Sequence, residues 1–185
     1  MSNEPVTCLG LDFGGKFGYA VGRANKIIEC GTLELAKRAK QLRKEPETAL
    51  DHMLREIITR YDVGAISWEN SVAAFSGSMR GVRKKAPSED ERGFDLGPAM
   101  IKHARYEGIV IVLSDKKNLI KVPPIHNTSL KKFATGNHKA KKDLMIAWAN
   151  RLYGLNLGDD DDNTADACHV CAHVMQKYRT VAPPF

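Results

Sequence analysis

The chain has 185 residues, 43% of them hydrophobic, and 28 Lys and Arg outnumber 22 Asp and Glu, giving a formal net charge of +6. No apolar run approaches the roughly 20 residues that cross a bilayer, so no membrane partner is expected, and without a Gly/Ser or Pro linker we expect residues 1–185 to form one domain. Four cysteines behind a polar N-terminus favour a reducing compartment, and a cytoplasmic protein is expected.

The first part of the chain predicts a meander of strands followed by a helix. Apolar or alternating runs separated by Gly-rich or polar turns predict three antiparallel strands, over residues 6–11, 17–22 and 27–33. From Pro46 to Tyr61 apolar residues recur at helical spacing, and Pro46 lies near the expected helix start. A short apolar run over residues 65–68 predicts a fourth strand.

Beyond residue 70 the elements are predicted to alternate. Residues 71–94 show no sustained periodicity and predict a connection. A helix is expected over residues 95–107, and the β-branched run Ile109–Leu113 predicts a buried parallel strand. Further helices are predicted over residues 127–133, 140–153 and 164–178. The order βββαβαβα predicts an α/β fold with a mixed sheet, three antiparallel strands then parallel strands, and helices on both faces; this resembles the ribonuclease H-like arrangement.

Acidic residues mark three places in this predicted fold. Asp12 and Glu69 end the first and fourth predicted strands, and Asp162 and Asp166 open the last helix. Carboxylates gathered at one sheet edge repel each other unless a divalent cation neutralises them, so the pattern predicts a magnesium site for phosphodiester chemistry. The structural alternatives are a turn residue at Asp12, a cap at Glu69 and a helix N-cap at Asp162.

Four segments in this order resemble RuvC-type Holliday-junction resolvases, in the form often found in bacteriophages. They are Leu9-Gly-Leu-Asp-Phe-Gly-Gly15, Ile66-Ser-Trp-Glu69, Gly136-Asn-His-Lys-Ala-Lys-Lys142 and Asp162-Asn-Thr-Ala-Asp-Ala167. His138 stands where the family has a second glycine. The third metal ligand is left open among Asp161, Asp162 and Asn163; Asp162 is preferred because a carboxylate is the better magnesium ligand, and residues 159–161 also fit a solvated acidic run.

The resemblance implies the chemistry and the substrate. Two Mg²⁺ ions about 4 Å apart, with Mn²⁺ as a substitute, would bind Asp12, Glu69, Asp162 and Asp166, and Lys142 would reach the scissile phosphate. Cleavage would leave 5′-phosphate and 3′-hydroxyl ends. The implied protein is a homodimeric endonuclease of DNA recombination and repair that cuts branched DNA such as a four-way junction, in the cytoplasm of a bacterial or phage-infected cell.

Basic and apolar residues suggest where DNA and a second subunit would bind. Contacts with DNA phosphates are predicted for Arg80, Arg83, Lys84 and Lys85. Lys139 and Lys141 are expected to contact backbone phosphates or only solvent. Helix-spaced apolar residues that fit either a dimer interface or ordinary core are Phe94, Leu96, Met100 and Ile101.

Other readings of the sequence remain open. The same carboxylates would serve a nuclease for RNA/DNA hybrids or structured RNA, and a junction-binding protein without catalysis is a further alternative. Asp12-Phe-Gly-Gly-Lys16 also resembles the phosphate loop of actin-like and sugar-kinase nucleotide binders, but the chain has no second Gly-rich adenine motif. Cys168-His-Val-Cys171-Ala-His173 has zinc-ligand spacing, although buried helix cysteines explain it more simply.

Overall fold

Three hairpin-connected strands open the fold, as the sequence predicts. The computed structural model describes residues 5–14, 16–70 and 98–181. An antiparallel meander is formed by β1 (Thr7–Asp12), β2 (Phe17–Arg23) and β3 (Lys26–Leu33). Every residue of β1 is buried, because this strand lies inside the sheet with helices over both of its faces.

The next strand along the chain adds to β1 in parallel. In β4 (Val63–Asn70), Ile66 lies opposite Leu9 and Trp68 opposite Leu11. Two short strands, β5 (Ile120–Lys121) and β6 (Ile125–His126), also pair in parallel with β4, and the sheet order is β3-β2-β1-β4-β5. The predicted mixed sheet is confirmed.

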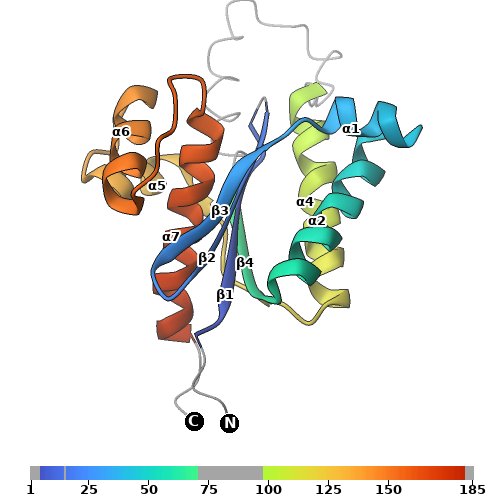
Figure 1. Ribbon diagram of the computed structural model, residues 1–185, viewed down its shortest axis with the longest axis horizontal. Coiled ribbons are helices and arrows are strands. Elements are labelled where there is room, and N and C mark those ends of the chain that lie inside the picture. The colour runs from blue at the N-terminus through green and yellow to red at the C-terminus, as the bar shows by residue number, and fades with distance from the viewer. Residues whose placement is uncertain (1–4, 15, 71–97, 182–185) are drawn as a thin grey trace, which may run out of the picture.

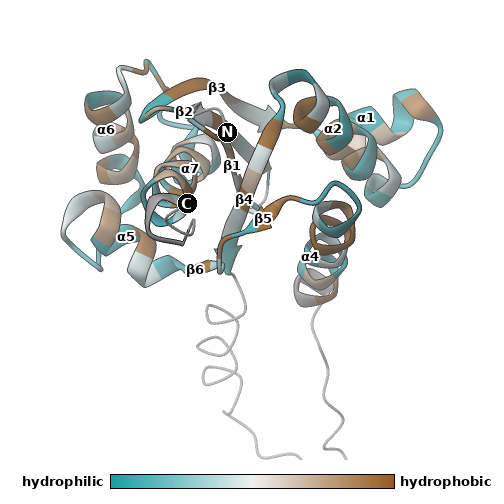
Figure 2. Cartoon of the chain, turned by 90° about the horizontal axis from the view of Figure 1, so that it is seen from below, coloured by the Kyte–Doolittle hydropathy of each residue, from teal (hydrophilic) through white to brown (hydrophobic). Residues whose placement is uncertain are grey.

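Helices cover both faces of this sheet, again as predicted (Figures 1 and 2). The helices of one face are α1 (Leu35–Leu42), α2 (Pro46–Tyr61) and α4 (Pro98–Lys116). Those of the other face are α5 (Asn127–Thr135), α6 (Lys142–Tyr153) and α7 (Asp162–Val181). Each layer of helices packs its own cluster of buried apolar residues against the strands. No helix in the described ranges combines the length and apolar character that a bilayer crossing requires.

The predicted strand Ile109–Leu113 is wrong, because these residues belong to α4. A strand buried on both faces would hide the whole run, but Ile111 is 38% and Val112 53% exposed. Tyr106, Val110 and Leu113 recur at helical spacing and are buried instead. A short β-branched run does not distinguish a buried strand from one side of a helix. Three further elements, α1, β5 and β6, were not predicted from the sequence.

The last helix, α7, packs directly on the backbone of β1 and β2. Its residues Ala167, Val170 and Cys171 are fully buried. A Cβ atom on Gly10 of β1 would lie 2.2 Å from the backbone nitrogen of Cys171, and one on Gly18 of β2 would lie 2.1 Å from the carbonyl oxygen of Asn163. Glycine at these positions therefore lets the helix approach closely enough to bring its first turns to the end of β1.

Candidate metal centre

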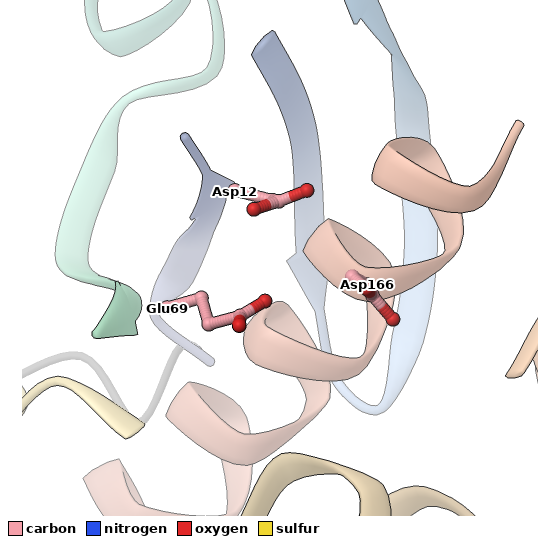
Figure 3. A group of neighbouring side chains, drawn as sticks. All are labelled: Asp12, Glu69 and Asp166. Atoms are coloured by element: carbon pink, nitrogen blue, oxygen red, sulfur yellow. The ribbon is translucent and has the colours of Figure 1, made fainter. Parts of the chain in front are cut away.

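Three acidic side chains from distant parts of the sequence meet at one edge of the sheet (Figure 3). Asp12 ends β1, Glu69 lies one residue before the end of β4, and Asp166 lies in the second turn of α7. One carboxylate oxygen of each residue lies within 4.8 Å of the others. The parallel pairing of β1 and β4 brings the strand ends together, and the close packing of α7 adds the third acid.

The surroundings oppose the ionised form of all three acids. Burial raises the pKa of Asp12 well above its usual value, and the charges of Glu69 and Asp166 raise it further. Burial, with the charges of Glu69 and Asp162, raises the pKa of Asp166 to about 7. Burial also raises the pKa of Glu69. Without a cation, burial therefore favours the protonated form of each of these acids.

Hydrogen bonds reach only some of the carboxylate oxygens of these three acids. The Gly14 backbone N–H donates to Asp12 Oδ1 at 3.1 Å, and the Asn127 side-chain amide donates to Glu69 Oε1 at 2.8 Å. Asp166 Oδ1 is buried and has no hydrogen-bond partner among the described residues. A buried oxygen without a partner is costly, and a divalent cation with oxygen ligands would satisfy it. The donor set and its charge therefore fit a hard cation such as Mg²⁺.

Asp162 and Lys142 lie beside this cluster and contact each other. The Lys142 ammonium forms an ion pair with Asp162 Oδ2, and this contact raises the pKa of Lys142. The Asp162 charge also raises the pKa of Asp12 and Asp166. Asp162 is thus close enough to act on the cluster, while its carboxylate is held by Lys142. Metal ligation by Asp162 and phosphate contact by Lys142 remain predictions.

The two alternatives to Asp162 make other contacts. Asp161 Oδ2 accepts a hydrogen bond from the Gly158 backbone N–H at 2.9 Å, within the turn before α7. Asn163 lies over the turn after β1, where a Cβ atom on Gly14 would be 1.8 Å from Asn163 Oδ1. Neither residue belongs to the group of three acids within 4.8 Å, and Asp162 also lies outside it. The Asp162 charge nevertheless raises the pKa of Asp12 and Asp166, and the choice of Asp162 as the additional ligand rests on that effect.

Two residues that the sequence analysis missed face the acids from α5. Asn127 bonds to Glu69, and the charge of Lys131 lowers the pKa of both Glu69 and Asp166. They are four residues apart, and therefore lie on one side of the helix. That spacing was visible in the sequence, but only the docking of α5 against the end of β4 shows that this side faces the site.

The predicted DNA-contacting residues lie in two regions. Lys139 and Lys141 are exposed in the connection that leads into α6, close in sequence to Lys142. Their contact with DNA remains a prediction. The other group, Arg80, Arg83, Lys84 and Lys85, lies outside the described residues.

The side chains of Cys171 and His169 in α7 have structural partners. The Cys171 thiol donates to the Cys8 carbonyl oxygen at 3.4 Å, and the fully buried His169 bonds to Tyr153 Oη at 2.9 Å and to the Met145 carbonyl oxygen at 3.0 Å. Within the described ranges, the three acids are the group of ligand-type side chains close enough to hold a metal. The Cys-x-x-Cys spacing therefore reflects core packing, as its simpler explanation predicts.

Comparisons with known proteins define the class of this fold. No family model matches the chain, and no curated protein matches its sequence. Solved structures do match, and they show that the chain has the α/β fold of RuvC-type Holliday-junction resolvases, as the sequence resemblance predicts.

Three of these solved structures illustrate the likeness. RuvC of Thermus thermophilus matches with a TM-score of 0.62 at 12% identity, over 97% of this chain and 100% of that one. The T. thermophilus RuvC in complex with a Holliday junction substrate matches with a TM-score of 0.65 at 16% identity, over 97% and 99%. The yeast mitochondrial Holliday junction resolvase Ydc2 matches with a TM-score of 0.53 at 13% identity, over 96% and 83%.

Proposed function

We propose that this protein is a metal-dependent, structure-selective endonuclease that cuts branched DNA. The observation that carries the proposal is the largely buried group Asp12, Glu69 and Asp166 at the sheet edge of a resolvase-like fold, in which one Asp166 oxygen has no hydrogen-bond partner among the described residues. One of the similar structures holds a Holliday junction substrate, which supports a four-way junction as the DNA.

The chain's own residues would divide the work of phosphodiester hydrolysis. Asp12, Glu69 and Asp166, with Asp162 as a fourth carboxylate, would hold two Mg²⁺ ions, which would supply water activation and charge stabilisation for the departing 3′ oxygen. Lys142 is exposed next to the acids and would offset the negative charge that develops on the scissile phosphate. Lys131 places a second cation near Glu69 and Asp166. The products would carry 5′-phosphate and 3′-hydroxyl ends.

Basic residues near the acids would hold the DNA backbone. The exposed side chains of Lys139 and Lys141 lie beside Lys142, where they can neutralise phosphates. We assign the same role to Arg80, Arg83, Lys84 and Lys85. Such contacts are independent of base sequence, which suits an enzyme that selects the shape of its DNA.

A homodimer would give the enzyme the two-fold symmetry of its substrate. The exposed side of α4 carries the apolar residues Ile101, Ile111 and Val112, which are 41%, 38% and 53% exposed. Gly108 lies between them and is open. An exposed apolar helix surface is suited to an interface between two copies, and two copies would nick opposing strands symmetrically.

A panel of substrates tests the proposal. The wild-type protein is incubated with a labelled immobile four-way junction, a linear duplex of the same sequence and an RNA/DNA hybrid, each with Mg²⁺ or with EDTA. Metal-dependent nicks in the junction alone are expected. Preferred cleavage of the hybrid would instead identify a nuclease for RNA, and junction binding without cleavage in any divalent metal would identify a binding protein.

A further inference from the structure

A short segment of chain runs along the end of β4 and holds it in place. The Val122 backbone N–H donates to the Ile66 carbonyl oxygen at 2.9 Å, and the Ser67 hydroxyl donates to the Pro123 carbonyl oxygen at 3.2 Å. Two residues further, β6 pairs with β4 in a register that sets Ile125 opposite Glu69. The backbone that carries Glu69 is therefore fixed by residues 122–126, which we call the edge segment.

The edge segment leads directly into α5, as Figure 2 shows. Asn127 is the first residue of this helix, and its side-chain amide donates to Glu69 Oε1 at 2.8 Å. The helix itself is anchored, because Leu130 is fully buried and Ala134 is 5% exposed in the core shared with α7. The donor is thus held on a rigid element.

The bond restricts what the Glu69 carboxylate can do. Glu69 is only 7% exposed, and its side chain has several torsions that would otherwise move its oxygens relative to Asp12 and Asp166. A donor on Oε1 fixes the plane of the carboxylate and leaves lone pairs available to a cation. Asn127 does this without adding charge, whereas an ammonium group in its place would compete with the metal.

We infer that Asn127 is a positioning residue, which orients the Glu69 carboxylate for metal binding and thereby raises the metal affinity of the site. Partners that orient a metal ligand typically contribute 10–100-fold to affinity or activity, as an order of magnitude. The consequence for DNA cleavage rests on the proposed function. The consequence for metal binding does not.

The test compares Asn127→Leu, which keeps the branching and the number of side-chain heavy atoms but removes the donor, with Asn127→Ala and the matched control Thr128→Ala. Thr128 is exposed and adjacent on the same helix. Titration calorimetry with Mn²⁺ on the intact chain is expected to show affinity about 10–100-fold weaker in both Asn127 variants and unchanged in the control. Thermal unfolding in EDTA identifies any variant that has lost its fold.

The outcomes separate this inference from the proposed function. If both folded Asn127 variants bind Mn²⁺ as the wild type does, the positioning role is overturned, whatever DNA the protein cuts. If the wild type binds Mn²⁺ and cuts no junction, the proposed function fails, while weaker Mn²⁺ binding by the Asn127 variants still supports the positioning role.

Discussion

At the scale of single residues, Asp166 is the acid whose environment argues most directly for a metal. Its Oδ1 atom is buried without a hydrogen-bond partner among the described residues, and its pKa is raised to about 7. Asp12 and Glu69 shift in the same direction because burial also disfavours their ionised forms. A metal ion would compensate this cost, and its binding would release the protons that the acids hold.

This environment predicts how stability depends on pH. The folded protein raises the pKa of Asp166 from 3.8 to about 7. The contribution of this residue to the stability of the metal-free fold is therefore fully present below about pH 4 and is lost as pH rises through 7. Mg²⁺ binds the ionised acids and should restore it. We expect the increase in Tm on adding Mg²⁺ to be larger at pH 8 than at pH 5.5, measured against EDTA. An equal increase at both values would contradict the assignment.

The role of Lys142 can be separated from simple DNA binding. Lys142→Ala removes a charge next to the acids, and we expect junction cleavage to fall about 100-fold while junction affinity falls only severalfold. Its ion pair with Asp162 is exposed on the lysine side, so stability should change by less than about 1 kcal/mol. Lys139→Ala, the control, should weaken binding and cleavage alike. Equal losses for Lys142→Ala would remove its catalytic role.

At the scale of elements, the close approach of α7 to the sheet positions Asp166. A Cβ atom on Gly10 would lie 2.2 Å from Cys171 N and 2.5 Å from the Ala167 carbonyl oxygen, both backbone atoms. Gly10→Ala should therefore displace the helix, lower the free energy of unfolding by about 1–3 kcal/mol and weaken Mg²⁺ binding. Chemical denaturation and calorimetry measure the two effects.

A second glycine supplies the control for this experiment. Gly108 lies inside α4, and nothing lies within 4 Å of an added Cβ atom there. Gly108→Ala should stabilise the protein by about 0.5–1 kcal/mol, because alanine is the better helix former. Normal stability and metal binding in Gly10→Ala would show that α7 has room to move.

Different elements were predictable for different physical reasons. The meander, α2 and β4 combine clear periodicity with turn residues, and the sequence analysis found them. Ile109–Leu113 was misassigned because β-branched residues suit a buried strand as well as one side of a helix. β5 and β6 have two residues each and depend on tertiary contact with β4. The meeting of Asp12 and Glu69 was predictable because they lie at the ends of neighbouring strands, but Asn127 reaches the site only through the docking of α5.

At the scale of the whole molecule, the prediction concerns assembly. If the exposed apolar side of α4 joins two copies, the protein should be a dimer at micromolar concentration, measured by analytical ultracentrifugation. Val112 is 53% exposed on this surface, so a substitution there would disrupt the interface between the two copies directly. Val112→Glu should produce a folded monomer because two like charges would face each other across the symmetry axis. A monomeric wild type would contradict this interface and the symmetric cutting that depends on it.

We propose that the acidic cluster is the metal centre of a junction-cutting enzyme. The most direct test maps the nicks made in a labelled immobile four-way junction by the wild type, Asp166→Asn and Asp159→Asn. Asp159 is exposed in the same acidic stretch, so its variant loses the same charge outside the cluster. We predict paired, Mg²⁺-dependent nicks on opposing strands with the wild type and Asp159→Asn, and junction binding without nicks with Asp166→Asn. Cleavage by Asp166→Asn at the wild-type rate, or no cleavage by the wild type in any divalent metal, would contradict this assignment of the metal centre.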